Sequence, residues 1–400
     1  MKEKLKKGKS GITLIALVIT VIILLILAAV TIGALSGDNG ILEQAARAKE
    51  DTEEAAKTEN AYIEELEEII ETQGNEYIKN DDLPENQYLK EFITEWTVNA
   101  GDTITLPIYE KEEAEEERGE LETYFNYDFT VDYGDGTVLE VKSYNDENRK
   151  HTYTNSGTYT VKIKGICESW SFYHVPDSVE KVSKLVQWGV INAKHYDFGN
   201  CVNLNGNIPL PSRNSFNEVL SFRMLFYKCA NITGKIPNDL FKYATKVVTM
   251  ANVFNYATGL SGGIYEDLFV NCKEVTNFRF VFAGSSLSGN IPEDIFKENT
   301  KVNNFQGVFF ECVNLTGYLP KNIFSYSNVI ENLSVTISST NLKVSEIYIN
   351  SKIITNMENN GFLSNLGNET LKFYVPKDSE TEKNVRGLYG DKNNVIIEVF

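Results

Sequence analysis

The second half of the chain repeats one stretch five times, and its second copy reads Phe226-Tyr227-Lys228-Cys229-Ala230-Asn231-Ile232-Thr233-Gly234-Lys235-Ile236-Pro237. The glycine of this stretch recurs at a spacing of 27 or 28 residues, at Gly206, Gly234, Gly262, Gly289 and Gly317. A constant period in this range predicts a solenoid of stacked units. A single unit cannot bury its own apolar side, whereas a stack of units buries one continuous core.

Each repeat has an apolar series before its phenylalanine, such as Val219, Phe222, Leu225 and Phe226. The spacing of three, three and one residues predicts one face of a short helix. The Leu-Thr-Gly-x-Ile segment that follows predicts a short strand, in which the glycine permits a close approach of the next unit. The proline after it lacks an amide hydrogen and should end that strand. One repeat is therefore expected to be a strand, a corner and a helical return.

The order Val-x-x-Phe/Met-x-x-x-Phe-x-x-Cys-x-Asn-Leu-Thr resembles the BspA-like leucine-rich repeats of bacterial surface proteins, over residues 198–330. The Leu-Thr-Gly-x-Ile-Pro part also looks like the plant extracellular class, although the period here is longer. Either resemblance implies a leucine-rich-repeat solenoid whose strand face binds an unknown protein or glycan. Repeat geometry then predicts ligand contacts at the positions between Leu and Ile of each repeat, which are Asn205, Asn207, Thr233, Lys235, Ser261, Ser288, Asn290, Thr316 and Tyr318.

Three of the five cysteines, Cys201, Cys229 and Cys312, lie three residues after the repeat phenylalanine, and Ala257 takes that position in the third repeat. A position that accepts Cys or Ala is expected to be small and buried. A disulfide between Cys201 and Cys229 of neighbouring units is the alternative. A metal site would need closely spaced pairs, so none is predicted.

The chain begins with a basic leader, residues 1–11, that holds five lysines and one glutamate. A run of 21 uncharged residues from Ile12 to Ile32 follows. At about 1.5 Å per residue this run is roughly 31 Å long as a helix, the thickness of a bilayer core. It predicts a transmembrane helix over residues 12–33 in the lipid bilayer, with the lysines in the cytoplasm and the bulk of the chain extracellular at the cell surface.

Residues 9–18, Lys-Ser-Gly-Ile-Thr-Leu-Ile-Ala-Leu-Val, resemble the leader of type IV prepilins. The resemblance implies that a prepilin peptidase cleaves after Gly11 and methylates the new amino terminus, Ile12. The family has an acidic residue at the fifth mature position, where this chain has Ala16. Because that acid pairs with the terminus of a neighbouring subunit, its absence argues against filament assembly. A single-pass anchor without processing is the alternative.

Residues 34–84 are expected to form an acidic helical stalk and a linker. Residues 38–72 carry twelve acidic and three basic side chains, and residues 110–122 carry eight and two. These two segments account for most of the net charge of −18, so the rest of the chain is close to neutral. Nucleic-acid binding is not expected, because it requires a basic footprint.

Residues 85–166 alternate polar and apolar residues in short runs, which predicts strands. The set Asp132-Tyr133-Gly134-Asp135-Gly136-Thr137, His151-Thr152-Tyr153 and Gly157-Thr158-Tyr159-Thr160-Val161 resembles a PKD-type immunoglobulin-like domain. The resemblance implies a β-sandwich that serves as a spacer or adhesive module. Asp132 and Asp135 offer oxygens to Ca²⁺, but two carboxylates are few and a hairpin explains them without a metal. His151 is expected to pack and form hydrogen bonds inside the domain.

Residues 167–197 are expected to cap the first solenoid unit, with Trp188 in the core. Residues 331–400 are expected to form a C-terminal α/β cap. The cap should contain strands at residues 333–337, 346–349, 372–375 and 395–399 and a helix at residues 380–389.

The sequence shows no pattern of an enzyme. None of its three histidines lies near a nucleophile motif, and it has no phosphate loop, dinucleotide fingerprint or His-Glu-x-x-His motif. No catalytic residue, cofactor or metal site is therefore predicted. The sequence favours a multidomain, membrane-anchored surface protein that displays a recognition solenoid in an adhesion-like role. The alternative is a pilin-like subunit or minor component of a type IV-like filament or pseudopilus.

Overall fold

The computed structural model describes residues 90–112, 122–212, 214–357 and 370–400. The chain divides into two units, Met1–Glu85 and Asn86–Phe400, and every element described below belongs to the second. The predicted leader, transmembrane helix and stalk, with the processing position at Gly11 and Ile12, therefore lie outside the described residues. Within the described ranges, no helix is long and apolar enough to cross a membrane.

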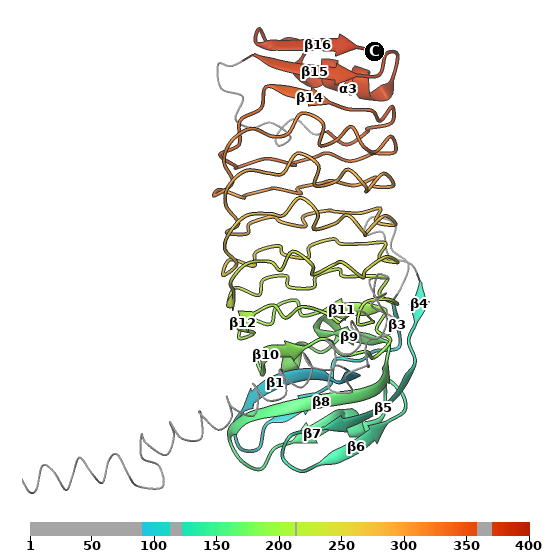
Figure 1. Ribbon diagram of the computed structural model, residues 1–400, viewed down its shortest axis with the longest axis vertical. Helices are drawn as coiled ribbons and strands as arrows, with labels where there is room; N and C mark the ends of the chain where they lie inside the picture. The colour runs from blue at the N-terminus through green and yellow to red at the C-terminus, as the bar shows by residue number, and fades with distance from the viewer. Residues whose placement is uncertain (1–89, 113–121, 213, 358–369) are drawn as a thin grey trace, which may run out of the picture. The chain divides into compact units, whose positions relative to one another are not determined.

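The second unit begins with a five-stranded antiparallel sheet in the order β10-β1-β8-β5-β6 (Figure 1). Along β1 and β5 every second side chain is buried, as expected for strands with one face on a core. Two short antiparallel pairs, β2 with β7 and β3 with β4, lie in the same region. The strands are β1 (Phe92–Val98), β2 (Thr103–Thr105), β3 (Lys111–Glu112), β4 (Thr123–Tyr124), β5 (Tyr127–Asp132), β6 (Val138–Val141), β7 (Lys150–Thr152), β8 (Gly157–Cys167) and β10 (Val182–Gln187).

The Gly-Asp-Gly sequence forms the turn between β5 and β6. Asp132 Oδ1 accepts a hydrogen bond from the amide of Gly134 at 2.8 Å, and Asp135 Oδ1 accepts one from the amide of Thr137 at 3.0 Å. The second oxygen of Asp135 lies 2.7 Å from His151 Nε2, whose ring stacks on Tyr133 at 4.4 Å. The two carboxylates therefore hold the turn and the histidine. The prediction that His151 packs and forms hydrogen bonds here is confirmed.

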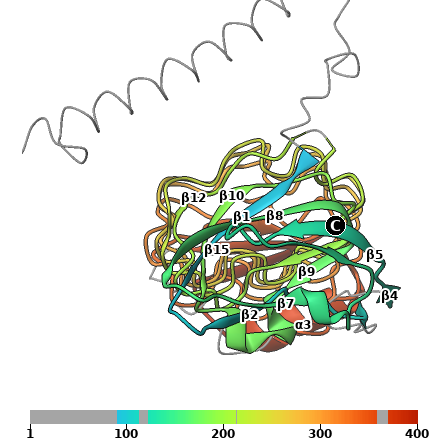
Figure 2. The same cartoon turned by 90° about the horizontal axis from the view of Figure 1, so that it is seen from below.

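The rest of the unit is a β-solenoid of about eight turns (Figure 1). Parallel β-bridges connect one residue of each solenoid turn to its equivalent in the next turn. Seen along the stack, the solenoid turns lie over one another, as the predicted repeat requires (Figure 2). The bridges start at β9 (Ser169–Ser171) and β11 (His195–Asp197) and continue through Ser221, Thr249, Asn277, Asn304, Asn332 and Asn356.

The predicted helical return is wrong, because successive β-turns occupy that part of the repeat. Met224 and Lys228 adopt φ of 59° and 58°, outside the helical region. The amide of Leu225 donates to the carbonyl of Phe222 at 3.0 Å, and the amide of Cys229 donates to that of Phe226 at 3.1 Å. Each of these β-turns brings the third residue back to the interior. The same three-residue spacing of apolar residues therefore arises without a helix.

Columns of stacked phenylalanines fill the solenoid core. The rings of Phe198, Phe226, Phe254, Phe282 and Phe309 follow one another at centroid distances of 6.1, 6.2, 6.0 and 5.9 Å. A second column holds Phe241, Phe269 and Phe296 at 5.8 and 6.1 Å. All of these rings are buried. Because each ring contacts its equivalent on both sides, the repeat itself specifies the register of the stack.

The cysteine position of the repeat is small and buried, as predicted. Cys229 Sγ lies 3.0 Å from the carbonyl oxygen of Phe198, and Cys312 Sγ lies 3.0 Å from that of Phe282. All five cysteines of the chain are buried and form no disulfide. The alternative of a disulfide between Cys201 and Cys229 is therefore wrong, since the thiols donate to main-chain oxygens instead.

The sheet and the solenoid share one core. β10 pairs with β1 of the sheet, and its Lys184 forms a parallel bridge with Asn205 of the solenoid. The predicted boundaries at residues 166 and 197 thus fall within continuous hydrogen-bonded layers. Trp188 is buried, as predicted, and its Nε1 donates to the carbonyl of Pro209 at 2.8 Å. Three 3₁₀ helices, η3 (Glu147–Arg149), η4 (Phe172–His174) and η5 (Pro176–Ser178), lie in this N-terminal part.

The C-terminal end consists of three parallel strands and one helix. The strands are β14 (Glu346–Tyr348), β15 (Leu371–Val375) and β16 (Val395–Val399). The helix α3 (Glu380–Tyr389) begins where the Ser379 side chain accepts a hydrogen bond from the amide of Glu382 at 3.0 Å. These three strands and the helix were predicted. The strand predicted at 333–337 is wrong, because these residues continue the β-turn series of the solenoid.

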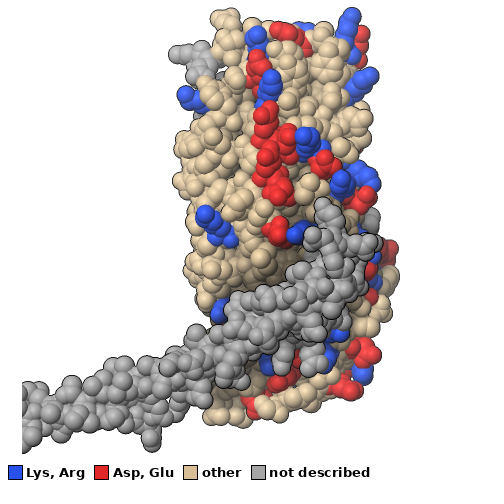
Figure 3. Space-filling view, viewed as in Figure 1, with Lys and Arg blue, Asp and Glu red and all other residues tan. Residues whose placement is uncertain are grey.

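Charged side chains pair between neighbouring solenoid turns. Lys246 lies 2.7 Å from Glu218, Lys301 lies 2.5 Å from Glu274, and Lys273 lies 2.8 Å from Glu298. Figure 3 shows acidic and basic side chains gathered in lines along the stack, separated by uncharged surface. Exposed pairs of this kind each stabilise a fold by less than about 1 kcal/mol.

Candidate ligand-binding site

The nine predicted ligand positions form one exposed column along the solenoid. Parallel pairing of β12 (Gly206–Asn207) with β13 (Ile232–Thr233) places the first of them side by side. Bridges from Gly234 to Leu260 and from Gly289 to Leu315 continue the column. The structure therefore brings together residues that lie up to four repeats apart in the sequence.

Two residues of this column also hold neighbouring turns in place. The side chain of Asn207 lies over Gly234, and the side chain of Asn290 lies over Gly317. Both glycines have φ of +80°, and a Cβ at either position would collide with the asparagine carboxamide. Asn207 and Asn290 are thus packing residues as well as exposed ones.

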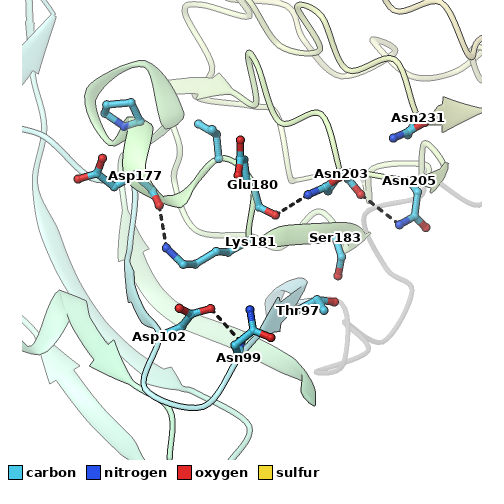
Figure 4. A pocket seen from close by; sticks show the side chains of 12 residues that line it. Thr97, Asn99, Asp102, Asp177, Glu180, Lys181, Ser183, Asn203, Asn205 and Asn231 are labelled. Atoms are coloured by element: carbon cyan, nitrogen blue, oxygen red, sulfur yellow. Dashed lines mark hydrogen bonds between the residues drawn. The ribbon is translucent and has the colours of Figure 1, made fainter. Parts of the chain in front are cut away.

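A polar cleft of about 900 Å³ opens where the sheet meets the first turns of the solenoid (Figure 4). Three segments supply its walls, and the side chains from all three surround the same space. Of the predicted ligand positions, only Asn205 lines it. The lining of the cleft includes Thr97, Asn99 and Asp102 from the sheet region, Asp177, Glu180, Lys181 and Ser183 from the connecting segment, and Asn203, Asn205 and Asn231 from the solenoid.

Hydrogen bonds to the main chain hold the asparagines of the cleft. Asn203 Nδ2 donates to the carbonyl of Glu180 at 2.8 Å, and Asn205 Nδ2 donates to that of Asn203 at 3.2 Å. Asn231 Nδ2 donates to the carbonyl of Val202 at 2.6 Å. Because the amide nitrogens serve the scaffold, each side chain is fixed in one orientation. A prepositioned wall of this kind lowers the entropy that a ligand must overcome.

The charge of the cleft is negative. Its lining includes three acidic residues, Asp102, Asp177 and Glu180, and one basic residue, Lys181. Lys181 Nζ donates to the main-chain oxygen of Asp177 at 2.9 Å, and Asp102 Oδ2 accepts from the amide of Asn99 at 2.8 Å. An anionic ligand would meet repulsion here, whereas hydroxyl groups could donate to the carboxylates and accept from the amides.

Sequence reasoning missed a buried polar network between β3 and β11, which lines no part of the cleft. The hydroxyl of Tyr109 donates to the carboxylate of Glu112, and the same oxygen lies 2.6 Å from His195 Nδ1. Glu112 Oε2 lies 3.5 Å from that nitrogen. Since the tyrosine proton points to Glu112, His195 Nδ1–H donates to the tyrosine oxygen. The network fastens β3 to β11.

The network perturbs the titration of Glu112. Burial alone would raise the pKa of this carboxyl group, but hydrogen bonds from His195 and Tyr109 and the charges of His195 and Arg223 outweigh burial and lower the pKa to about 2. The sequence feature that could have revealed the network is the residue type at the position that forms the β-bridges between solenoid turns. His195 occupies a position that Ser221, Thr249 and Asn277 fill in later solenoid turns.

Comparison with known proteins identifies no relative, since no protein-family model, curated protein or solved structure matches this chain. In the described part of the chain, no three His, Cys, Asp or Glu side chains lie close enough together to hold a metal ion.

Proposed function

We propose that this protein is a membrane-anchored cell-surface protein that recognises glycans through its solenoid. The observation that supports this proposal is the polar cleft between the sheet and the first solenoid turns, the junction cleft. It is a space of about 900 Å³ with fixed polar walls, and it continues into the exposed column through Asn205. The cleft volume is within the range of small-molecule sites, about 300–1,000 Å³.

The ligand that suits the cleft is an uncharged sugar. Its hydroxyl groups are both donors and acceptors, so they match carboxylates, carboxamides and the hydroxyls of Thr97 and Ser183. The surplus of carboxylates disfavours acidic sugars and nucleic acid alike. The exposed column beyond Asn205 would extend contacts along a longer chain.

We also propose an architecture for the whole chain. The repeat order supports kinship with BspA-like leucine-rich repeats, and the side chains of Asp132 and Asp135 in the Gly-Asp-Gly turn support a PKD-like spacer. The uncharged run at residues 12–33 supports a membrane anchor with the bulk of the chain extracellular. No catalytic role is proposed.

A glycan array tests the proposal, probed with the full chain in detergent. We expect one or more neutral oligosaccharides to bind and the double variant Asp177→Asn/Glu180→Gln to lose at least about tenfold in affinity, because charge-assisted hydrogen bonds are removed. Asp391→Asn/Glu398→Gln, which removes two exposed carboxylates of the C-terminal end outside the cleft and the column, is the matched control. An array on which no neutral glycan binds, or on which the double variant binds like the wild type, would refute the proposal.

The leader residues favour a second candidate, a pilin-like subunit. The test is the mass of the N-terminal peptide of protein recovered from membranes. A chain that starts at N-methylated Ile12 would support handling by a prepilin peptidase and raise the filament alternative despite Ala16. A chain that retains Met1 and its lysines would leave an unprocessed anchor.

A further inference from the structure

A second groove, of about 400 Å³, lies on the β-turn face of the solenoid and shares no lining residue with the junction cleft. We propose that it binds a sugar that carries a carboxylate. The inference goes beyond the proposed function, because it concerns another site and a ligand of opposite charge preference. The lining of the groove includes Tyr173, Arg223, Asn255, Tyr256, Arg279 and Phe280.

Two arginines lie at the same position of the repeat, two solenoid turns apart. Arg223 and Arg279 are separated by the small side chain of Ala251 in the intervening turn. The guanidinium of Arg223 lies 5.2 Å from the ring centre of Tyr173, and that of Arg279 lies 5.1 Å from the ring centre of Phe280. Rings at this distance attract and orient a guanidinium group. An oriented guanidinium matches a carboxylate through two parallel hydrogen bonds.

Of the two, Arg279 is the one assigned to the ligand. Arg223 is only 4% exposed, and its charge helps to lower the pKa of Glu112 and offsets part of the rise that burial causes in the pKa of Asp197. Its charge therefore already serves the buried network at β3 and β11. Arg279 is partly exposed and lines the groove.

A buried acceptor in the groove requires a donor from the ligand. Asn255 is 7% exposed, and its Nδ2 donates to Asn252 Oδ1 at 2.7 Å. Its Oδ1 is buried and accepts no hydrogen bond from the described residues. An unpaired buried acceptor destabilises a protein by about 1–3 kcal/mol, and a ligand hydroxyl would remove that penalty. A carboxylated sugar brings this hydroxyl together with the anion.

Glycines in the next solenoid turn leave room for the aromatic walls of the groove. The ring of Tyr256 lies over Gly284 and the ring of Phe280 lies over Gly307, where a Cβ would collide with them. Tyr173 and Tyr256 remain 52% and 37% exposed. Pockets for organic ligands combine such aromatic surface with a few placed polar groups. The Tyr256 hydroxyl donates to Glu311 at 2.6 Å, so the carboxylate of the ligand belongs at the arginine end.

The main chain at this face argues for a sugar rather than a peptide. The amides of Phe222, Met224 and Phe226 donate to carbonyls of the next solenoid turn at 3.1, 2.9 and 2.8 Å. Those of Met250, Asn252 and Phe254 do the same one turn later. These ladders leave no strand edge in the groove to which a peptide could add a strand. Recognition there depends on side chains.

Isothermal titration of the full chain in detergent with sodium glucuronate tests the proposal, and glucose is the neutral control. We expect glucuronate to bind at least about tenfold more tightly than glucose. Arg279→Ala should abolish this preference, and Arg279→Lys should restore part of it, because lysine keeps the charge but not the fork. Tyr173→Ala, at an exposed position, should weaken binding by about threefold or more.

The double variant Asp177→Asn/Glu180→Gln of the junction cleft should bind glucuronate like the wild type, so failure of one site is distinguished from failure of the other. A disaccharide ending in glucuronate that binds more tightly than the monosaccharide would identify a glycan end as the source, and equal binding would identify the free sugar. Equal affinity for glucose and glucuronate, or an unchanged Arg279→Ala variant that retains wild-type thermal stability, would overturn the proposal. Tighter binding of a tetraglutamate peptide than of glucuronate would overturn it in favour of a peptide partner.

Discussion

The thiol of Cys229 lies 3.0 Å from the main-chain oxygen of Phe198, which belongs to the preceding solenoid turn. The ring of Phe198 stacks on that of Phe226, which lies in the same turn as Cys229, at a centroid distance of 6.1 Å. The small residue and the large residue of the repeat therefore act together. The ring fills the core, and the thiol adds a second donor to a buried carbonyl that also accepts a hydrogen bond from the amide of Cys201 at 3.1 Å.

The cysteine thiols should not react with Ellman's reagent while the protein is folded. Burial raises the pKa of each thiol, that of Cys312 to about 12, and the thiolate is the reactive form. In guanidinium chloride all five should react. A thiol that reacts rapidly in the native state would show that a solenoid turn opens locally.

Gly234→Ala should destabilise the protein more than Gly289→Ala. Both glycines have positive φ, so each substitution should cost about 1–2 kcal/mol in backbone strain. Only at Gly234 would the new Cβ also meet the Asn207 carboxamide, and turning this exposed side chain away should add about 0.5–1 kcal/mol. Free energies of unfolding in urea give the comparison. The double variant Asn207→Ala/Gly234→Ala should recover the added part, and equal losses for the two single variants would contradict this account.

Much of the solenoid could be predicted because its period, its ring columns and its cysteine positions are local properties of the repeat. Helix α3 could be predicted for the same reason, since its cap at Ser379 and its apolar residues are close in sequence. The helical return was wrong because a three-residue spacing of apolar residues fits both a helix and successive β-turns. Only the left-handed backbone at residues such as Met224 distinguishes them, and neither glycine nor proline marks that residue.

The candidate sites were less predictable, because they join distant parts of the chain. Tyr109 and His195 are 86 residues apart, and no short motif connects them. The junction cleft needs Asn99, Asp177 and Asn203 from three segments whose meeting depends on the pairing of β10 with β1. Repeat geometry could predict only the exposed column, of which one residue, Asn205, reaches the cleft.

Phe254→Ala should be among the most destabilising single substitutions, with a loss of about 3–5 kcal/mol. The ring is fully buried and stacks on Phe226 and Phe282, so its removal leaves a cavity in the middle of the stack. Tyr318→Ala is the control, because that aromatic side chain is 51% exposed. It should change the free energy of unfolding by less than about 0.5 kcal/mol. Comparable losses in the free energy of unfolding for both variants would mean that the phenylalanine column does not stabilise the core.

Glu112→Gln should remove part of the acid sensitivity of the fold. The pKa of Glu112 is about 2 in the folded protein and 4.5 as its ordinary value. Because the folded value is the lower one, the unfolded state binds the proton first as the pH falls. The stabilisation by Glu112 is therefore complete above about pH 4.5 and is lost between there and about pH 2.

The advantage of the wild type over Glu112→Gln in free energy of unfolding should accordingly shrink by about 2 kcal/mol between pH 6 and pH 3. Tyr109→Phe, which removes the hydroxyl that donates to Glu112, should produce part of the same change. Tyr318→Phe, at the exposed column, should leave the pH dependence as in the wild type. An advantage that stays constant from pH 6 to pH 3 would show that the carboxylate is not held by Tyr109 and His195. The network would then fasten β3 to β11 through packing alone, such as the edge-to-face contact of the Tyr109 and His195 rings at 6.1 Å.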